Sequence, residues 1–436
     1  MEETGSEIMI RFYKETNFKE TPIGKIPKDW NIVKLSNIAR DIYYGITAKA
    51  VENNTGLRML RTTDIKDYNV KWNTLPFCKI TEKRGDLRRF LLQKDDLIIA
   101  RAGTTGISVL VDKKLDNVIF GSYLIKVKLC EKVFPKFMHY FCQSRFYWNH
   151  IISSQAGSTL KNISLPVLKS LNVPLPPLEE QKVIAHVLST VDKAIQKTNE
   201  IIAKTERLKK GLMQELLTKG IGHKEFKDTE IGRIPKEWEV VKLKDVILEA
   251  KPGFACGKRD ENGILQLRMD NIETEGWINT QAGVRIPVAK NVEEYLLKPG
   301  DILFNNTNSA DLIGKTAIFR GEFSRCVYSN HLTRIRVNPN KVLPEWILYV
   351  FIRNWRRGIF RAIRHQHVHQ AGINKADLLN LKIPIAPLKE QRSITKMLLS
   401  VDKKLRIEMK EKKKLERIKQ ALMDLLLTGK IRVKVA

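Results

Sequence analysis

The stretch FKETPIGKIPKDWNIVKL, from Phe18 to Leu35, returns 208 residues later as FKDTEIGRIPKEWEVVKL, from Phe226 to Leu243. Two unrelated segments do not match over this length by chance. Self-similarity at a fixed separation is typical of a repeated structural unit, and such a repeat decides the symmetry of the fold. The sequence of 436 residues is therefore interpreted as a tandem duplication of one unit.

The far ends of the two units also correspond. VPLPPLEEQ (Val173–Gln181), with STVDK further on, is matched by IPIAPLKEQ (Ile383–Gln391), with LSVDK further on. The tails GLMQELLTKGI (Gly211–Ile221) and ALMDLLLTGKI (Ala421–Ile431) are similar as well. Each unit thus begins and ends with matched segments.

The middles of the two units share a frame of apolar positions and differ in most polar residues. The clearest remaining matches are LRTTDI (Leu60–Ile65) with LRMDNI (Leu267–Ile272), and KDDLIIAR with KPGDILFN. A shared frame with a divergent polar surface is what two binding modules for two different targets would have.

The pattern inside one unit predicts a mixed fold. Short β-branched runs from about Asn53 to Val133 alternate with Gly, Asp and Asn clusters, which indicates a small mixed sheet with hairpins. Phe134–Ile151 has apolar residues at steps of three and four and predicts an amphipathic helix. The opening GKIPKDW and GRIPKEW segments predict an extended entry to a strand or short helix. Their tryptophans, Trp30 and Trp238, are expected to anchor the core.

After the prolines at 174–177, apolar residues follow steps of four and three over about 40 residues, or ~60 Å of helix. The second copy repeats this stripe, although Glu408, Lys412 and Lys419 interrupt it. Neither helix can bury its stripe alone, so we expect the two to pair antiparallel about an approximate two-fold axis. An ordinary hairpin, or a dimerisation coil unrelated to spacing, is the alternative. The predicted seam consists of Leu188, Val191, Ile195, Ile202, Leu212, Leu216, Leu398, Val401, Leu405, Leu415, Leu422 and Leu426.

The charge of the chain points to a polyanionic partner. Lysine and arginine number 77 against 48 acidic residues, a formal net charge of +29, which favours nucleic acid or an anionic membrane. No apolar run approaches the ~18 residues needed to cross a bilayer, and MEETGSEIMIRFYKE lacks the layout of a secretory signal. We therefore expect no membrane insertion and no export. The five cysteines form no CxxC pair, which favours a reducing cytoplasm over a disulfide framework or a zinc knuckle.

Taken together, these motifs resemble the specificity subunit of type I restriction-modification enzymes over essentially the whole chain. The resemblance rests on IGKIPKDW and IGRIPKEW, on PLPPLEEQ and PIAPLKEQ, and on the long helices after them, in the right order at repeat spacing. It implies that each of two recognition domains reads one half of a bipartite, asymmetric double-stranded DNA site with a nonspecific spacer. It also implies that the helices dock two methyltransferase subunits, which recruit the restriction subunits.

The expected fold class is α+β, with two mixed α/β target-recognition domains separated by two long helices that pair as an antiparallel coiled coil, in a pseudo-two-fold internal repeat. Modules ~35 Å apart would meet the same face of a duplex, so the helices would set the half-site spacing. The expected boundaries are an N-terminal tail at 1–17, recognition domain 1 at 18–174, helical region 1 at 175–225, recognition domain 2 at 226–384 and helical region 2 at 385–436.

We expect the chain to carry no chemistry and no cofactor of its own. The amino-methyltransferase tetrapeptide, Asn or Asp followed by Pro-Pro-aromatic, is absent, as is a Gly-rich turn suited to S-adenosylmethionine. Gly314, Lys315 and Thr316 mimic the end of a phosphate-binding loop, but Ser309 stands where that loop needs Gly. The flanking residues indicate a hairpin instead.

The alternating His365, His367 and His369 could in principle face one metal ion from an extended segment. No cysteine or acidic residue stands nearby in the sequence. The duplication places this segment opposite Ser154–Ser158, so a DNA-facing loop or a plain solvated loop is favoured over a metal site, and we expect no metal.

Phosphate contacts from lysine and arginine should supply affinity, and a few side chains on base edges should supply sequence choice. Asparagine suits adenine and arginine suits guanine, although solvated turn residues remain the alternative at any one position. Trp72, Trp148, Trp277 and Trp355 are expected in the core rather than stacked on bases. The candidates for DNA contact lie in turns of the divergent middles: Arg58, Arg61, Thr63, Arg101, Thr104, Thr105 and Lys161 in the first unit, and Arg268, Asn271, Asn305, Asn306, Asn308, His331 and His367 in the second.

Two other functions remain open on the sequence. One is a stand-alone DNA-bridging or regulatory protein that holds two sites through its coil and needs no methyltransferase. The other is an enzyme with a concealed nuclease or methyltransferase site. A neighbouring methyltransferase gene would favour the specificity subunit, and activity of the purified chain with magnesium or a methyl donor would favour the enzyme.

Overall fold

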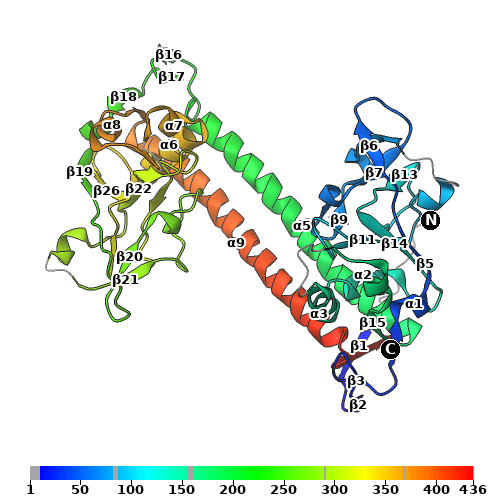
Figure 1. The fold of residues 1–436 in the computed structure, drawn as a ribbon. Coiled ribbons are helices and arrows are strands. Elements are labelled where there is room, and N and C mark those ends of the chain that lie inside the picture. Colours follow the sequence, from blue (N-terminus) through cyan, green and yellow to red (C-terminus); the bar gives the residue numbers. More distant parts are fainter. Residues whose placement is uncertain (1–9, 82–86, 156–161, 289–290, 367–369, 436) are drawn as a thin grey trace. The chain divides into compact units, whose positions relative to one another are not determined.

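The computed structural model describes residues 10–81, 87–155, 162–288, 291–366 and 370–435. Contacts divide the chain into two compact units: unit 1 comprises residues 1–199 and 410–436, and unit 2 comprises residues 200–409. Two helices of 39 residues, α5 (Leu178–Leu216) and α9 (Leu388–Leu426), each contribute to both units (Figure 1). The prediction of two long helices is therefore confirmed.

Unit 1 is built around two four-stranded sheets. One has the order β12-β11-β14-β5, and every residue of its strand β11 is buried. The other has the order β13-β7-β10-β6 and is mixed, because β13 runs parallel to β7 while β10 is antiparallel to both its neighbours. The strands are β5 (Ala39–Tyr44), β6 (Ala48–Val51), β7 (Arg58–Leu60), β10 (Phe77–Ile80), β11 (Leu97–Ala100), β12 (Ser108–Leu110), β13 (Val118–Phe120) and β14 (Leu124–Leu129).

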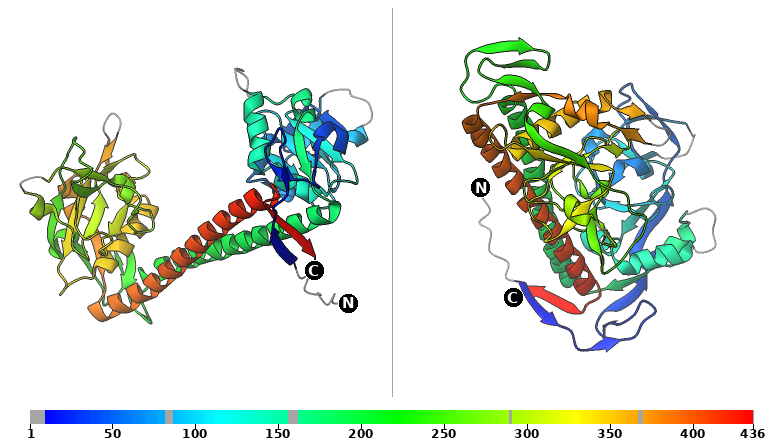
Figure 2. Two further views of the ribbon diagram at one scale, coloured as in Figure 1. Left: turned by 90° about the horizontal axis from the view of Figure 1, so that it is seen from below. Right: turned by 90° about the vertical axis from the view of Figure 1, so that its left-hand side faces the viewer.

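Short strands and helices close unit 1 around these sheets. β4 pairs with β15, which brings the start of the globular module beside its end. The first and last strands, β1 and β30, pair antiparallel and lie side by side (Figure 2). The elements are β1 (Ile10–Lys14), β2 (Phe18–Lys19), β3 (Ile26–Pro27), β4 (Asn31–Lys34), β8 (Ile65–Lys66), β9 (Asn69–Val70), β15 (Asn172–Leu175), β30 (Ile431–Val435), α1 (Leu35–Ile38), α2 (Pro135–Phe141), α3 (Arg145–Ser154) and α4 (Leu165–Lys169).

Unit 2 repeats this topology. Its sheet β24-β22-β26-β19 has the same strand order as β12-β11-β14-β5, and its sheet β21-β20-β25 again contains one parallel pair. The elements are β16 (Phe226–Thr229), β17 (Gly232–Pro235), β18 (Glu239–Lys242), β19 (Ile247–Pro252), β20 (Ile264–Leu267), β21 (Val284–Ile286), β22 (Ile302–Asn305), β23 (Thr307–Asn308), β24 (Thr316–Ile318), β25 (Cys326–Tyr328), β26 (Leu332–Val337), β27 (His365–Gln366), β28 (Ala371–Gly372), β29 (Lys382–Ile385), α6 (Pro344–Arg356), α7 (Ile359–Ala362) and α8 (Lys375–Leu379).

The prediction of one helix over 134–151 is wrong in its continuity. The helix ends at Phe141 and a second one begins at Arg145. Between them Ser144 adopts an extended backbone, and its hydroxyl accepts a hydrogen bond from the amide of Tyr147. A serine cap of this kind starts a new helix, and apolar periodicity alone does not reveal it.

A buried joint fixes the start of each long helix to its own module. In unit 1 the Trp30 indole N–H donates to Glu180 at 3.1 Å, and the Arg432 guanidinium donates to both oxygens of the same carboxylate. In unit 2 Trp238 donates to Glu390 at 2.9 Å. Both tryptophans are fully buried, which confirms them as core anchors. The two repeated sequence motifs are thus the two halves of one hydrogen-bonded joint.

The glutamine that follows this glutamate makes the same contacts in both units. Gln181 accepts the amide of Phe134 at 2.8 Å and donates to two backbone carbonyls. Gln391 accepts the amide of Leu343 at 3.0 Å and again donates to two carbonyls. Both amides lie at the N-cap of the first helix after the sheet, so each glutamine ties that helix to the long one.

A Tyr–Asp–Lys contact ties the two long helices to each other within each unit. In unit 1 Asp192 of α5 accepts from the Tyr140 hydroxyl at 2.7 Å and pairs with Lys419 of α9 at 2.8 Å. In unit 2 the equivalent groups are Asp402 of α9, Tyr349 and Lys209 of α5. Lys419, which interrupts the apolar seam in the sequence, is therefore an interhelical ion-pair partner.

The apolar seam is buried most deeply toward the helix ends. Leu188 and Leu426 belong to one core cluster of unit 1, and Leu398 belongs to the core of unit 2 together with Met213 and Leu217. The start of each helix therefore packs against the end of the other, which makes the pair antiparallel. Leu405 is also buried, and the remaining predicted seam residues are half-buried: Val191, Ile195, Ile202, Leu212, Leu216, Val401, Leu415 and Leu422.

We expect substitution of Lys209 and of Lys419 to lower the stability of the protein by different amounts, because the two ion pairs differ in burial. Lys209 and Asp402 are 1% and 2% exposed, whereas Lys419 and Asp192 are 21% and 37% exposed. Lys209→Met would leave a buried carboxylate without its cation, so we expect a loss of about 3–5 kcal/mol in the free energy of unfolding. Lys419→Met should cost about 1 kcal/mol or less, because water screens that pair. Urea denaturation of the two variants measures the difference, and equal losses would contradict this account.

Candidate DNA interface

In unit 1 the structure brings three of the candidate segments together at one edge of the module, beyond the carboxyl ends of strands β7 and β11. Arg61 follows strand β7, and Arg101 follows strand β11. The two loops touch, since a Cβ atom on Gly103 would lie 3.6 Å from the Thr62 hydroxyl. The amide of Ile163 donates to the carbonyl of Arg101 at 2.9 Å, which joins the third segment to the same edge. Lys161, a candidate on that segment, lies outside the described residues.

The candidates of unit 1 differ in how freely they present their polar groups. Thr63 and Thr104 are exposed, and Thr105 is half-buried. Arg61 is exposed and forms a two-point ion pair with Asp64, whose carboxylate also accepts the Arg61 amide. That pair fixes the turn and orients the guanidinium.

Two arginine candidates of unit 1 are held against aromatic rings. The Arg101 guanidinium lies over the Tyr44 ring at 4.4 Å, and its Nε is buried without a hydrogen-bond partner in the described part of the chain. Arg58 lies over Phe77 and donates to the carbonyls of two residues in the following loop. Arg58 is thus engaged inside the module, whereas Arg101 retains unused donor capacity.

In unit 2 an asparagine network shapes the corresponding edge. Asn305 is fully buried and donates to the carbonyl of His331 at 3.2 Å. Asn308 is 8% exposed and donates to Asn305 at 2.8 Å, and Asn306 donates to the Thr333 hydroxyl at 2.9 Å. Asn305 and Asn308 direct their amides inward, so in this structure they hold the loop in shape rather than offer an amide to a base.

The turn at 268–271 shows the same division of roles. Asn271 is fully buried, accepts the amide of Arg268 at 2.8 Å and donates to the carbonyl of Asn279 at 2.8 Å. It therefore supports the turn from within. Arg268 is half-buried and lies on the rim of that turn.

The candidates Asn306 and His331 lie beside a hollow of about 530 Å³. Asn306, Asn330 and His365 are among its lining residues, which come from three separate stretches of sequence. Strand pairing explains this meeting, because β23 pairs with β28 and β28 with β27. His331 is half-buried next to it, and its backbone carbonyl accepts the amide of Asn306.

The histidine run has an acidic neighbour that its sequence context did not reveal. His365 forms a 2.6 Å contact with Asp377 of α8. His367 and His369 lie outside the described residues. Among the residues that the structure does describe, no group of three or more His, Cys, Asp or Glu side chains is arranged to hold a metal ion.

Lys315, in the segment that mimics a phosphate-binding loop, has a structural contact. Its ammonium donates to the backbone carbonyls of Met269 and Ile272, and burial lowers its pKa. The flanking strands β22 and β24 pair antiparallel, which confirms the hairpin interpretation. Lys315 thereby connects the 268–271 turn to the Asn305 loop, a link that the sequence did not indicate.

The four tryptophans considered for base stacking are engaged inside their units. Trp72 is buried, and the Trp148 indole N–H donates to the Tyr68 hydroxyl at 3.1 Å. Trp277 contacts the Arg320 guanidinium, 4.0 Å from its ring centroid. Trp355 is half-buried against the core of unit 2.

The division between supporting and exposed residues predicts different mutational effects. Asn305→Ala removes a buried amide that donates to one partner and accepts from another, so we expect a loss of about 1–3 kcal/mol in the free energy of unfolding. Thr104→Ala, at an exposed position, should change stability by less than about 0.5 kcal/mol. Calorimetry on both variants measures this, and an Asn305→Ala variant as stable as Thr104→Ala would contradict the supporting role.

The fold and this edge define a duplicated protein in which two related modules present different polar loops on one repeated frame. The family model for the type I restriction modification DNA specificity domain matches residues 27–207 and again residues 235–417. The chain therefore belongs to the family of type I restriction-modification specificity subunits, and its function is recognition of a DNA sequence.

Relatives match over nearly the whole length of the chain. The putative MjaX specificity subunit of Methanocaldococcus jannaschii is 32% identical over 98% of this chain and 99% of its own. The MjaVIII specificity subunit of the same organism is 30% identical, again over 98% of this chain and 99% of its own. The EcoKI specificity subunit of Escherichia coli is 23% identical over 86% of this chain and 82% of its own.

Solved structures show the same fold at lower identity. The type I restriction-modification S subunit from M. genitalium has a TM-score of 0.59 at 15% identity and covers 93% of this chain and 98% of its own. A chain from a study of type I system assembly and conformational transition has a TM-score of 0.55 at 18% identity, with 93% of this chain and 99% of that one covered. These agreements confirm the α+β class and the repeated architecture.

Proposed function

We propose that this chain reads a bipartite, asymmetric site on double-stranded DNA and holds two methyltransferase subunits and the restriction subunits on it. Residues 18–174 would read one half-site and residues 226–384 the other. The long helices at 175–225 and 385–436 would set the spacer. The work would take place in the cytoplasm, where the host DNA lies.

The observation that carries this proposal is the contrast between the repeated joints and the divergent edges. Trp30, Glu180 and Asp192 recur as Trp238, Glu390 and Asp402 with the same partners or contacts of the same kind. The edges instead present arginine and threonine in unit 1 and arginine, asparagine and histidine in unit 2. Different side chains on one backbone frame suit different base sequences.

We infer that the direct contacts come from the accessible members of the candidate set. In unit 1 these are Arg61, Thr63, Arg101, Thr104 and Thr105, and in unit 2 Arg268, Asn306 and His331. Lys161 and His367 remain proposals on sequence grounds. Arg58, Asn271, Asn305 and Asn308 would act by holding the loops.

We also propose that the chain performs no catalysis. The net charge of +29 suits binding to phosphates, and the amino-methyltransferase tetrapeptide is absent from the sequence. The methyl transfer and DNA cleavage would thus belong to the partner subunits.

None of the helices in the described residues is long and apolar enough to cross a membrane.

Mapping of methylated bases in host DNA, with and without this gene, tests the function directly. We expect a two-part motif that is methylated only when the gene is present, together with a purified complex that contains two methyltransferase subunits. Arg61→Ala combined with Arg101→Ala should relax recognition in one half of the motif and leave the other half unchanged. The unaltered second half is the internal control.

Two results would contradict the proposal. Unchanged methylation together with no complex would indicate a stand-alone DNA-binding protein. Relaxation of both halves by the unit 1 variant would contradict the assignment of one half-site to each module.

A further inference from the structure

Unit 2 contains a cavity of about 580 Å³ where the end of α5, the hairpin β16–β17 and the end of α6 meet. Part of its wall is apolar and is formed by Leu217, Phe226, Ile231, Ile234 and Pro384. The rest is polar and basic and is formed by Gln214, Thr218, Lys219, Arg233, Arg353 and Arg357. No aspartate or glutamate lines it among the described residues.

The arginines of this cavity have no carboxylate partner within the described part of the chain. Arg353 is half-buried, and its Nε has no hydrogen-bond partner there. Burial and the adjacent charge of Arg357 lower the pKa of Arg353 to about 10. Asp228 lies opposite Arg233 in the hairpin, yet the Arg233 guanidinium lies over the Phe226 ring at 5.3 Å. Within the residues that the structure describes, Lys219 is the one basic group of the cavity with an ion pair, which it forms with Glu215 at 2.8 Å.

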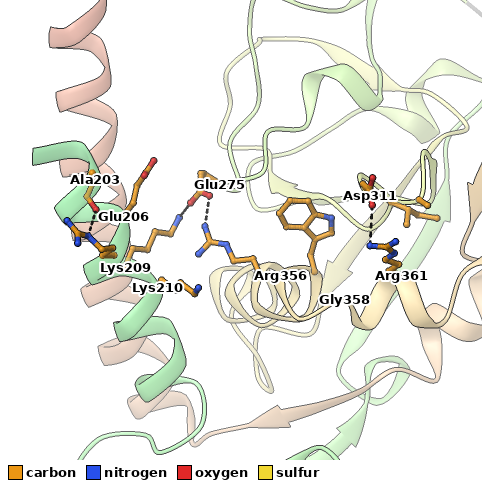
Figure 3. Close-up of a pocket in the computed structure, with 13 residues that line it drawn as sticks. Ala203, Glu206, Lys209, Lys210, Glu275, Asp311, Arg356, Gly358 and Arg361 are labelled. Atoms are coloured by element: carbon orange, nitrogen blue, oxygen red, sulfur yellow. Dashed lines mark hydrogen bonds and ion pairs between the residues drawn. The ribbon is translucent and has the colours of Figure 1, made fainter. Parts of the chain in front are cut away.

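A neighbouring cavity of unit 2 shows the more usual arrangement. This hollow of about 840 Å³ has five basic lining residues, Arg207, Lys209, Lys210, Arg356 and Arg361, and three of them, Lys209, Arg356 and Arg361, meet a carboxylate (Figure 3). Lys209 and Arg356 share Glu275, and Arg361 pairs with Asp311. Basic side chains that crowd together are costly unless an anion neutralises them. Among the described residues that line the arginine cavity, none supplies such an anion.

The duplicated frame does not account for these arginines. Counted from the matched prolines Pro135 and Pro344, the positions of Arg353 and Arg357 fall on Ser144 and Trp148 in the first copy. The carboxyl end of a helix favours a positive charge, which suits Arg357 at the C-cap of α6. That effect does not explain why Arg353 is half-buried one turn earlier.

We propose that this cavity receives an acidic side chain flanked by an apolar one, on a segment of a methyltransferase subunit. The inference rests on the proposed function, which supplies the partner. A guanidinium binds a carboxylate through two parallel hydrogen bonds, and the apolar wall suits the neighbouring side chain. The outer surface of a duplex is a continuous row of phosphates with no projecting side chain, so it fits this half-apolar cavity poorly. Because unit 1 lacks the arginines, the contact strengthens only one of the two docked methyltransferases.

The test compares the full-length wild-type chain with an Arg353→Met, Arg357→Met double variant. Each is titrated with the methyltransferase subunit of the same system, and bound copies are counted by native mass spectrometry. Wild type should bind two copies, and the variant should bind one copy normally and the second about 10- to 100-fold more weakly. Arg361→Met, which removes a nearby exposed charge, is the matched control and should bind two copies normally. An Arg353→Lys, Arg357→Lys variant, which keeps the charge but not the planar fork, should fall between.

Several outcomes would overturn the inference. A folded double variant that binds both copies with wild-type affinity would show that the cavity takes no part in docking. A variant with normal methyltransferase binding but weaker DNA binding would assign the cavity to backbone phosphates. Failure of the wild-type chain to bind any methyltransferase would contradict the proposed function instead, so the two failures are distinguishable.

Discussion

The architecture depends on one carboxylate near the start of each long helix. Glu180 and Glu390 are the second glutamate of PLEEQ and the glutamate of PLKEQ, and each accepts the indole N–H of a fully buried tryptophan from the opening motif of its unit. A buried carboxylate is costly unless its oxygens are satisfied. Unit 1 satisfies Glu180 further with Arg432, which also reaches Asp29, whereas unit 2 satisfies Glu390 with His223. The two repeated motifs of each unit are therefore joined by the same hydrogen bond in both copies.

This joint separates what the fold must keep from what recognition can vary. The hydrogen-bond partners of the tryptophan, the glutamate and the following glutamine are backbone groups, one another, Arg432 in unit 1 and His223 in unit 2, and none of these belongs to the loops at the ends of β7, β11, β20 and β22. Those loops can therefore carry Arg101 after β11 in unit 1 and Asn306 after β22 in unit 2 without disturbing the helices. The arginine cavity of unit 2 is a second difference, on a surface that shares no lining residue with the hollow beside Asn306.

Much of the fold could be predicted because the duplication shows the pattern of each element twice in the sequence. The long helices, the mixed sheets and the core tryptophans followed from repeated motifs and periodicity. The break at Ser144 did not, because a cap depends on one hydroxyl and leaves the apolar period intact. The split among the candidates between buried Asn305 and exposed Thr104 also could not be predicted, since both are polar residues at or just after the end of a strand. Only the fold decides which turn residue points inward.

The central claim is that each module reads its own half-site from an equivalent place on the frame. A chain in which residues 226–384 are replaced by a second copy of residues 18–174 tests this most directly. Methylation mapping of host DNA that carries this chain should reveal a palindromic motif, with the first half-site repeated in inverted orientation across the original spacer. Methylation of the original asymmetric motif by this chain would contradict the account.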